Sequence, residues 1–246
     1  MKIEGSVVLV TGANGGIGTA LVQELLKRGA DKIYVGARNV AALQPLLESS
    51  GRLVPLMLDV TKPDQIADAA ATAHDVTLVI NNAGLATFKG VLSASDTEAA
   101  RQEMEVNYFG VLSLLQALRD TPALHRGGAV INILSILALV TLPVAGTYAA
   151  AKAAALALTR TLRAEVKNRG VQVLGVLPVQ VDTAMGAPLP EPRLTPQEVA
   201  SGALDALESG AEEVFPGALS QGAAKAFRDN PEAMQAELSK FVHTLD

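Results

Sequence analysis

Residues 7–18 decide the fold, and they read Val7-Val8-Leu9-Val10-Thr11-Gly12-Ala13-Asn14-Gly15-Gly16-Ile17-Gly18. The apolar run 7–11 predicts a buried strand, and the apolar spacing after the glycines predicts a helix over residues 16–28. Gly12, Gly16 and Gly18 permit a tight turn and a close approach of the backbone to a pyrophosphate at the helix N-terminus. A plain strand-to-helix loop is the alternative, but the position of the turn between a strand and a helix favours a dinucleotide-binding unit.

The same alternation of short apolar runs and helical patterns continues along the chain, with no linker and no repeat of fixed period. Strands are expected at residues 7–11, 32–37, 53–58, 78–81, 129–134, 172–177 and 213–215. Helices are expected at residues 16–28, 41–49, 63–73, 98–118, 147–168 and 196–208, and the tail 219–246 also has a helical pattern. Most strands are apolar throughout, which is typical of a parallel sheet covered on both faces. The pattern predicts a single α/β domain over residues 1–246. Its core would be a doubly wound parallel sheet of about seven strands with helices on both faces.

Composition narrows the classes of function. The chain has 246 residues, 49% of them hydrophobic, and 20 Lys and Arg against 25 Asp and Glu give a net charge of -5. Nucleic acids and anionic membranes attract a basic protein face, so neither is an expected partner. The chain has no cysteine and its three histidines lack metal-ligand spacing, so neither a disulfide nor a metal site is expected. The first residues lack a signal-peptide core, and the predicted location is the cytoplasm.

The end of the second predicted strand indicates which dinucleotide binds. An acidic residue about 20 positions beyond the glycine turn binds the ribose 2′-hydroxyl of NAD, whereas an arginine there accommodates the 2′-phosphate of NADP. Ala37 stands at the acidic position and Arg38 follows it. This pair favours NADP over NAD, with a solvated loop charge as the alternative interpretation of Arg38.

Two further strand ends carry polar residues. Asp59 and Val60 close the third strand, where an adenine could lie, and Asn81-Asn82-Ala83-Gly84 closes the fourth. Asparagines that end a buried strand need hydrogen-bond partners, which neighbouring loops or a ribose could supply. For Asn81 a structural hydrogen bond is the main expected role.

Tyr148 and Lys152 lie one helical turn apart on one face of a predicted helix. Ser135 ends the fifth strand at the same edge of the sheet, and Asn107 lies in the middle of the preceding helix. A tyrosine titrates near pH 10, so acid–base work near neutrality requires its phenolate to be stabilised by about 4 kcal/mol. The Lys152 ammonium and the positive charge of an oxidised nicotinamide are the expected sources, and Ser135 would hold the substrate oxygen. Tyr-x-x-x-Lys alone is usually a helix surface pair; its conjunction with the serine, the asparagine and the glycine turn indicates a site.

Together these motifs resemble the short-chain dehydrogenase/reductase family in its single-domain branch. The resemblance rests on Thr11-Gly12-x-x-x-Gly16-x-Gly18, Asn81-Asn82-Ala83-Gly84, Asn107, Ser135, Tyr148-x-x-x-Lys152 and residues 178–183, in the family's order and spacing. It implies a Rossmann-type fold in which residues 1–125 form the cofactor half and residues 126–246 the catalytic and substrate half.

The resemblance also implies roles for single residues. Tyr148 would be the general acid/base, Lys152 would lower its pKa and bind the nicotinamide ribose, and Ser135 would orient the carbonyl. Asn107 would hold a water in a proton relay to Lys152. The cofactor would contact residues of the strand-end loops and the tetrad: Gly12, Asn14, Gly16, Ile17, Gly18, Arg38, Asp59, Val60, Asn81, Ala83, Gly84, Tyr148, Lys152, Pro178, Val181 and Thr183.

One position departs from the family pattern. The family usually has Pro-Gly after the sixth strand, whereas here Val179 follows Pro178. A β-branched valine makes a positive φ costly. If the loop keeps its usual path, Val179 would wall the substrate side; otherwise the contact expected of Thr183 with the carboxamide is in doubt.

The expected substrate pocket is almost uncharged. Its rim would comprise Leu85, Ala86, Ile136, Leu137, residues 142–144 and residues 184–194, with Ser135, Leu137 and Tyr148 as substrate contacts. Core packing is the alternative reason for these apolar residues. The leading hypothesis is NADPH-dependent reduction of an apolar ketone or aldehyde to the alcohol. An alcohol dehydrogenase that runs oxidatively and a non-catalytic NADP-sensing protein are the alternatives. The resemblance implies a homodimer or homotetramer built on helices 98–118 and 147–168.

Overall fold

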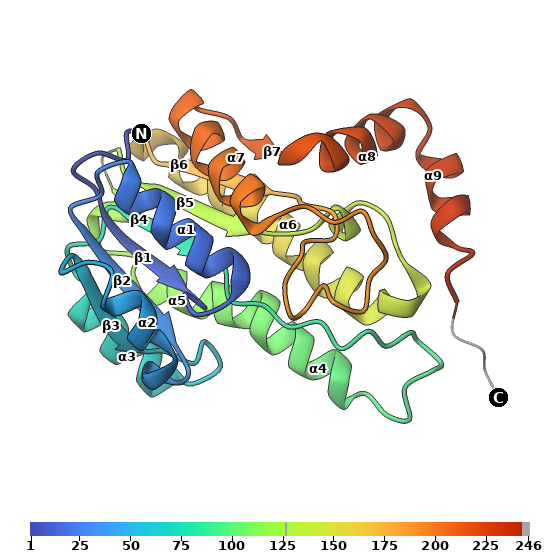
Figure 1. The fold of residues 1–246 in the computed structure, drawn as a ribbon, viewed down its shortest axis with the longest axis horizontal. Coiled ribbons are helices and arrows are strands. Elements are labelled where there is room, and N and C mark those ends of the chain that lie inside the picture. The colour runs from blue at the N-terminus through green and yellow to red at the C-terminus, as the bar shows by residue number, and fades with distance from the viewer. Residues whose placement is uncertain (126, 243–246) are drawn as a thin grey trace.

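The computed structural model describes residues 1–125 and 127–242, and in these ranges seven parallel strands form one sheet of order β3-β2-β1-β4-β5-β6-β7. The strands are β1 (Val7–Thr11), β2 (Lys32–Ala37), β3 (Leu53–Met57), β4 (Leu78–Asn81), β5 (Ala129–Ile133), β6 (Gln172–Val176) and β7 (Glu213–Val214). The strand order reverses between β1 and β4, so the carboxyl ends of these two strands flank the point where such sheets bind ligands. The predicted doubly wound parallel sheet is confirmed (Figure 1).

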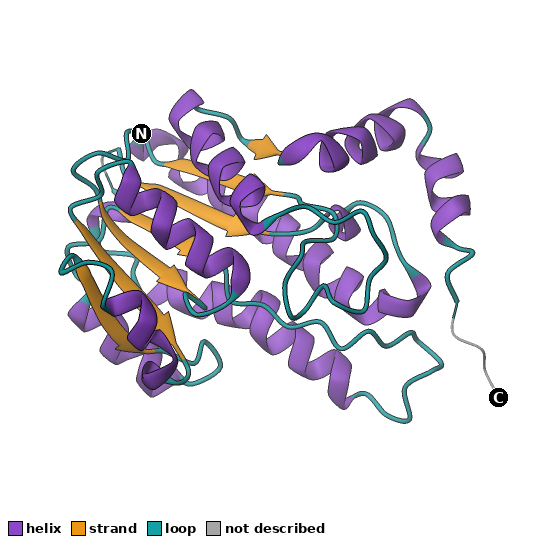
Figure 2. Cartoon of the chain, in the orientation of Figure 1, coloured by secondary structure: helices purple, strands orange, loops and turns teal. Residues whose placement is uncertain are grey.

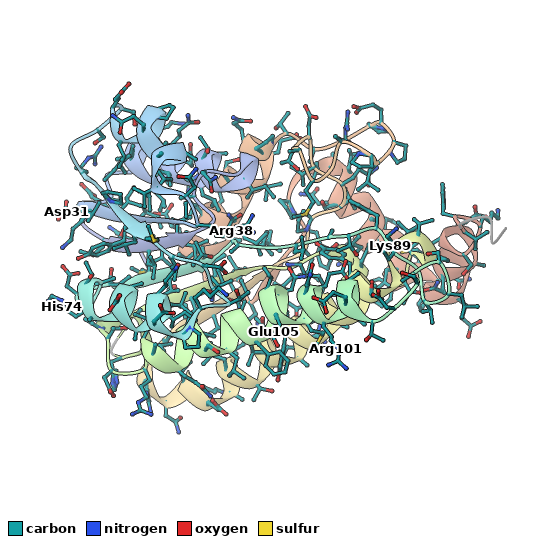
Figure 3. The ribbon with its side chains drawn as sticks, turned by 90° about the horizontal axis from the view of Figure 1, so that it is seen from below. Asp31, Arg38, His74, Lys89, Arg101 and Glu105 are labelled. Carbon is teal, nitrogen blue, oxygen red and sulfur yellow. The ribbon has the colours of Figure 1, made fainter. Side chains whose placement is uncertain are left out.

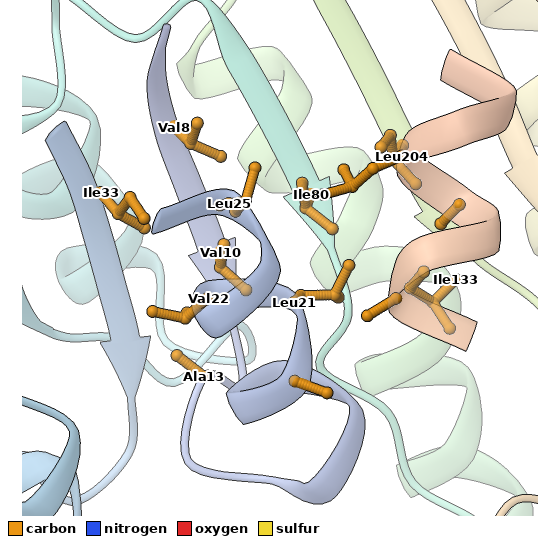
Figure 4. Packing of buried hydrophobic residues seen from close by; sticks show 14 of the residues in the cluster. Val8, Val10, Ala13, Leu21, Val22, Leu25, Ile33, Ile80, Ile133 and Leu204 are labelled. Carbon is orange, nitrogen blue, oxygen red and sulfur yellow. The ribbon is translucent and has the colours of Figure 1, made fainter. Parts of the chain in front are cut away.

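Helices cover both faces of the sheet (Figure 2). One face carries α1 (Gly16–Lys27), α2 (Gln44–Leu47) and α7 (Pro196–Ser209), and the other carries α3 (Pro63–Thr72), α5 (Gly110–Ala117) and α6 (Gly146–Val166). Strand β1 shows why its sequence is apolar throughout: Val8 and Val10 pack with Leu21 of α1, as Figure 4 shows. Leu9 points to the opposite face and packs with Leu114 of α5. Successive side chains of a strand alternate between faces, and here both faces are buried.

Three predicted helices differ in detail from the structure. The predicted helix 98–118 consists of α4 (Glu98–Met104), a π-helical turn (Glu105–Phe109) and α5. The predicted helix 41–49 is a 3-10 turn (Val40–Leu43) followed by α2, since Pro45 has no N–H to continue the hydrogen-bond ladder. The predicted helical tail is split by Pro231 into α8 (Gly217–Asp229) and α9 (Pro231–Leu238), and its residues 243–246 lie outside the described residues.

Helix α9 is attached to the loop that follows Ser135. The Gln235 side chain donates to the Thr141 carbonyl oxygen at 3.0 Å and accepts from the Thr141 N–H at 2.9 Å. The long loops after β4 and β6 gather at the same end of the sheet, the end toward which the strands point (Figure 2). In residues 1–125 and 127–242, no helix is long and apolar enough to cross a lipid bilayer.

Candidate active site

The glycine turn after β1 leaves an open helix N-terminus. Helix α1 begins at Gly16, and no side chain caps its first turn. A Cβ at Gly18 would lie 2.2 Å from the Gly12 carbonyl oxygen, and Gly12 has a φ of 64°, so both positions require glycine. The glycines allow the turn to fold tightly on itself, and the uncapped backbone amides fit a pyrophosphate group.

The loop after β4 fixes this turn. The Asn82 amide nitrogen Nδ2 donates to the carbonyl oxygens of Thr11 at 2.9 Å and Gly12 at 3.1 Å. The Thr11 hydroxyl accepts from the backbone N–H groups of Asn82 at 3.0 Å and Ala83 at 2.9 Å. The sequence motif gives Asn82 no role of its own, and the structure shows that Asn82 holds the glycine turn in place.

Asn81 lies in a buried chain of hydrogen bonds. Its Nδ2 donates to Asn132 Oδ1, and Asn132 Nδ2 donates to Thr159 Oγ1, both at 2.8 Å. These bonds join β4, β5 and α6 through the interior, which is the structural role expected of Asn81. A contact between Asn81 and a cofactor stays a prediction.

The candidate adenosine side lies at the ends of β2 and β3. Arg38 is exposed just beyond β2, and Figure 3 labels it among the N-terminal strands and helices. Asp59 Oδ1 accepts from the N–H and the hydroxyl of Thr61 at 2.9 and 2.8 Å, so one carboxylate oxygen is already engaged. Val60 is buried against Gly110, where an added Cβ would lie 2.9 Å from the Val60 carbonyl oxygen.

Ser135, Tyr148 and Lys152 meet beyond the carboxyl end of β5. Ser135 caps the turn that follows this strand, and its Oγ accepts from the Leu137 N–H at 3.1 Å. Tyr148 and Lys152 occupy the first two turns of α6, and Lys152 Nζ lies 5.7 Å from the centre of the Tyr148 ring. Lys152 is buried, and its Nζ donates to the Ile133 carbonyl oxygen at 2.9 Å.

Asn107 joins this cluster through the loop after β4. A Cβ at Gly84 would lie 3.2 Å from Asn107 Oδ1 and 3.7 Å from Lys152 Nζ, so Gly84 lies between the two side chains. Asn107 Oδ1 accepts from the Leu85 N–H at 3.1 Å, and its Nδ2 donates to the Leu85 carbonyl oxygen at 2.8 Å. In the structure, the Asn107 side chain holds the backbone of Leu85 in place. Its role in a water relay stays a prediction.

Burial acts on both ionisable groups of the cluster. Burial raises the pKa of Tyr148, a hydrogen bond with Ser135 opposes that rise, and the charge of Glu103 adds to it. Burial lowers the pKa of Lys152 to about 8. The expectation that Lys152 favours the phenolate is therefore not met by the protein groups alone, because the Tyr148 pKa lies above its ordinary value. The protein by itself keeps Tyr148 protonated.

Sequence reasoning missed Glu103, a fully buried carboxylate in α4. Glu103 accepts hydrogen bonds from the backbone N–H and the hydroxyl of Thr87 in the loop after β4. Its negative charge adds to the rise of the Tyr148 pKa. The signal that could have found it is its spacing, because Glu103 lies one helical turn before Asn107 and on the same face.

The loop after β6 adapts to valine at position 179. Among the described residues, Phe88 is the one non-glycine residue with a positive φ, so Val179 keeps an ordinary backbone conformation. Val179 is partly buried against the core cluster beneath α1 and α7. The Pro178 carbonyl oxygen accepts a hydrogen bond from the Ile136 N–H at 2.9 Å, and Val181 forms an isolated parallel β-bridge with Leu194. The costly positive φ does not occur at Val179, and a role of Val179 on the substrate side stays a prediction.

Thr183 reaches the glycine turn all the same. A Cβ at Gly16 would lie 2.6 Å from Thr183 Cγ2. The loop after β6 therefore packs against Gly16, the first residue of α1. Within residues 1–125 and 127–242, no three His, Asp or Glu side chains are grouped so that they could hold a metal ion.

Comparisons with known proteins agree with this geometry. The family model for short chain dehydrogenases matches residues 6–194, and the chain belongs to that family. A solved short chain dehydrogenase from Burkholderia cenocepacia, in complex with NADP, is 45% identical with a TM-score of 0.90, covering 97% of this chain and 99% of that chain.

Two curated relatives are more distant. The dehydrogenase/reductase SDR family member 7B of Rattus norvegicus is 32% identical over 195 residues, covering 74% of this chain. The match spans 59% of that relative's length. A 3-oxoacyl-(acyl-carrier-protein) reductase of Thermotoga maritima is 30% identical over 198 residues, covering 78% of this chain and 80% of that protein.

Proposed function

We propose that this protein uses NADPH to reduce an apolar ketone or aldehyde to the alcohol. The observation that carries the proposal is the convergence of Ser135, Tyr148, Lys152 and Asn107 beside an uncapped, glycine-lined helix N-terminus. A bound nicotinamide would supply the hydride. The protein's part is to place the carbonyl and to give it a proton.

Tyr148 is the proton donor in this proposal. The phenol form prevails near neutrality, because the ordinary pKa of a tyrosine lies near 10 and burial raises that of Tyr148 further. The phenol is the form that a carbonyl reduction needs. The Ser135 hydroxyl lies next to Tyr148 and can donate a hydrogen bond to the same carbonyl oxygen. Lys152 and Asn107 fix the surrounding backbone through Ile133 and Leu85.

NADP is the proposed dinucleotide. Three features support it: Arg38 is exposed at the end of β2, Ala37 occupies the acidic position, and the similar Burkholderia protein was solved with NADP. A guanidinium at that place suits a 2′-phosphate, whereas NADH offers it only a hydroxyl.

Substitution of Arg38 tests the preference. Arg38→Ala should weaken NADPH binding about tenfold to a hundredfold, because charge-assisted hydrogen bonds are worth about 1.5–3 kcal/mol, and should leave NADH nearly unchanged. Dissociation constants for both dinucleotides, measured by nicotinamide fluorescence, give the comparison. Arg101→Ala removes an exposed guanidinium on the outer side of α4, away from the glycine turn, and is the matched control (Figure 3). Equal losses for NADPH and NADH would show that Arg38 does not contact the phosphate.

The substrate class follows from the loops around Tyr148. Leu85, Ala86, Ile136 and Leu137 adjoin the cluster and carry no charge, which suits an apolar carbonyl compound. The direct experiment follows nicotinamide absorbance with NADPH and NADH in parallel across a panel of apolar ketones and aldehydes. Turnover with NADPH supports the proposal, and turnover of phosphorylated or anionic carbonyls alone would contradict the substrate class.

Two alternatives lead to different results in the same experiment. An alcohol dehydrogenase that works oxidatively would turn over the matching alcohols with NADP and reduce the carbonyls poorly. A sensing protein would bind NADPH and turn over nothing. The complete set of Asn107, Ser135, Tyr148 and Lys152 favours an enzyme over a sensor, because a protein that only binds has no use for it.

A homodimer or homotetramer is also proposed. Phe109 is 44% exposed on the helical segment that joins α4 to α5, and its ring stacks edge-on against Tyr108 at 5.0 Å between centroids. An exposed phenylalanine beside a half-buried tyrosine suits burial against a second copy. Light scattering during size-exclusion chromatography measures the mass, and a monomer at micromolar concentration would contradict this proposal.

A further inference from the structure

The loop after β6 closes on itself. Val181 forms a parallel β-bridge with Leu194, and the Asp182 N–H donates to the Leu194 carbonyl oxygen at 2.8 Å. The Leu194 N–H donates to the Gln180 carbonyl oxygen at 3.0 Å. Residues 182–193 therefore form an Ω-loop, which is a compact surface loop whose ends lie together and whose interior is packed by its own side chains.

Arg193 provides most of that internal bonding. Its side chain is only 18% exposed, although it comes from a surface loop. Nη1 donates to the carbonyl oxygens of Gly186 and Ala187, both at 3.2 Å. Nε donates to Glu191 Oε1 at 2.8 Å and lies 3.7 Å from the Asp182 carboxylate. One guanidinium thus joins the middle of the loop to a carboxylate near each of its ends.

The backbone of the loop has few donors that could do the same. Pro188, Pro190 and Pro192 have no N–H group, so this stretch lacks three backbone donors. The Leu189 N–H donates to the Gly186 carbonyl oxygen at 2.9 Å, and Arg193 donates to that same oxygen. A guanidinium has five N–H donors in one plane, so it can bind several loop acceptors at once.

The contacts continue from Gly186 to the glycine turn. The Gly186 N–H donates to Thr183 Oγ1 at 3.1 Å, while Thr183 Cγ2 would lie 2.6 Å from a Cβ at Gly16. A Cβ at Gly186 would lie 2.0 Å from the Val181 carbonyl oxygen, so the turn admits only glycine at this position. A series of direct contacts therefore joins Arg193, through Gly186 and Thr183, to the first residue of α1.

We propose that Arg193 is a positioning residue, which keeps this loop formed before a ligand binds and thereby holds Thr183 against the glycine turn. The inference rests on the proposed function, in which NADPH binds at that turn. An apparent dissociation constant is inversely proportional to the fraction of molecules that are competent to bind. A loop that is already formed therefore raises the affinity without adding a contact to the ligand.

Hydrogen exchange in the ligand-free protein tests the loop itself. Arg193→Gln removes the charge and the planar set of donors, so the amides of residues 182–194 should exchange about tenfold faster. Arg193→Lys keeps the charge but not the planar donors, and its exchange should be intermediate. Arg119→Gln is the matched control, because Arg119 is exposed and pairs with Asp120 at 3.6 Å. Unchanged exchange in Arg193→Gln would overturn the proposal.

The affinity for NADPH tests the consequence. The dissociation constant and KM for NADPH should rise about tenfold in Arg193→Gln, and saturating NADPH should restore slow exchange in the loop. The value of kcat at saturating NADPH should stay near that of the wild type, a split that a general loss of stability would not produce. Faster exchange with unchanged affinity would overturn the link between the loop and the glycine turn. A wild-type protein that binds no NADPH would instead overturn the proposed function, while the exchange experiment would still decide whether Arg193 orders the loop.

Gly186→Ala interrupts the same series of contacts at another point. The added methyl group would meet the Val181 carbonyl oxygen while Arg193 is retained, so faster exchange and weaker NADPH binding are again expected. Gly222→Ala is the control, because nothing lies within 4 Å of a Cβ there. A Gly186→Ala protein with wild-type exchange and affinity would overturn the path through Gly186. If Arg193→Gln fails to fold, Arg193→Lys and Gly186→Ala carry the same test.

Discussion

At the scale of single residues, the site is governed by burial of two groups that are one helical turn apart. The interior disfavours the charged form of each, so the pKa of Tyr148 rises while that of Lys152 falls to about 8. The negative charge of Glu103 raises the Tyr148 pKa as burial does, and the hydrogen bond with Ser135 lowers it. The balance leaves the phenol protonated, which is the starting state for protonating a carbonyl.

Tyr148→Phe tests the proton donor. The ring stays and the hydroxyl goes, so carbonyl reduction should slow by about a hundredfold to ten-thousandfold while the dissociation constant for NADPH stays near the wild-type value. Single-turnover kinetics and fluorescence titration measure the two quantities. Tyr108→Phe is the matched control, because Tyr108 is only partly buried and stacks on Phe109 through its ring. Reduction at an undiminished rate in Tyr148→Phe would show that another group supplies the proton.

Part of this residue-level arrangement was predictable. Tyr148, Lys152 and Ser135 were predicted to share a site because a helix turn and a strand end fix their positions, and the structure brings them together. The burial of Glu103 was not predicted, because a glutamate in a helix rich in charged residues is normally solvated. It is buried because α4 packs against α6. The rise of the Tyr148 pKa in the protein alone could not be predicted, since desolvation cannot be judged from spacing. A lowering of that pKa by Lys152 together with a bound nicotinamide stays a prediction.

At the scale of elements, the glycine turn is built by its neighbours as much as by its own sequence. Asn82 and Ala83 of the loop after β4 bind Thr11 and Gly12, and Thr183 of the loop after β6 lies over Gly16. The three loops follow β1, β4 and β6, whose carboxyl ends meet at one edge of the sheet. A change in one loop therefore reaches the others through direct contact.

A methyl group placed in the turn tests this packing. Gly18→Ala would put Cβ 2.2 Å from the Gly12 carbonyl oxygen, so we expect a loss of about 1–3 kcal/mol in stability and a large loss of NADPH affinity. Gly222→Ala is the control, because nothing lies within 4 Å of an added Cβ there and alanine suits the interior of α8. Thermal unfolding and NADPH titration of both variants give the comparison. A Gly18→Ala protein as stable as the wild type, with unchanged affinity, would contradict the close contact.

The elements themselves were largely predictable from apolar patterns. The seven strands lie where they were predicted, and for most of them the signal is an uninterrupted apolar run, because burial on both faces leaves that pattern in the sequence. The π-helical turn around Asn107 was not predicted, because one extra residue in a turn barely alters helical periodicity. Pro45 and Pro231 lie at the starts of α2 and α9 and interrupt segments that the helical pattern alone predicts as continuous.

At the scale of the whole molecule, the buried Lys152 makes the stability of the fold depend on pH. Its pKa of about 8 in the folded protein lies below the ordinary value of 10.5. Below about pH 8 Lys152 is protonated in both the folded and the unfolded protein, and the folded protein bears the full cost of burying the ammonium. Between the two values the folded state loses its proton while the unfolded state keeps it, so stability rises with pH.

Lys152→Met exposes that contribution. The variant has no ammonium to bury, so its stability relative to the wild type should be greatest near neutrality. That advantage should fall by about 3 kcal/mol toward pH 10. Denaturant unfolding of both ligand-free proteins across this range measures it, and the comparison cancels other groups that titrate. A difference that stays constant with pH would show that Lys152 does not titrate in this window.

The attachment of α9 has a consequence for how relatives diverge. The stretch that matches the family model ends at residue 194, whereas Gln235 holds the loop that carries Thr141, six residues beyond Ser135. A helix beyond the matched stretch thus holds the loop that follows Ser135. We expect that α8 and α9 can differ among homologues without a change in the chemistry at Tyr148, and that exchange of residues 217–242 between homologues alters substrate preference.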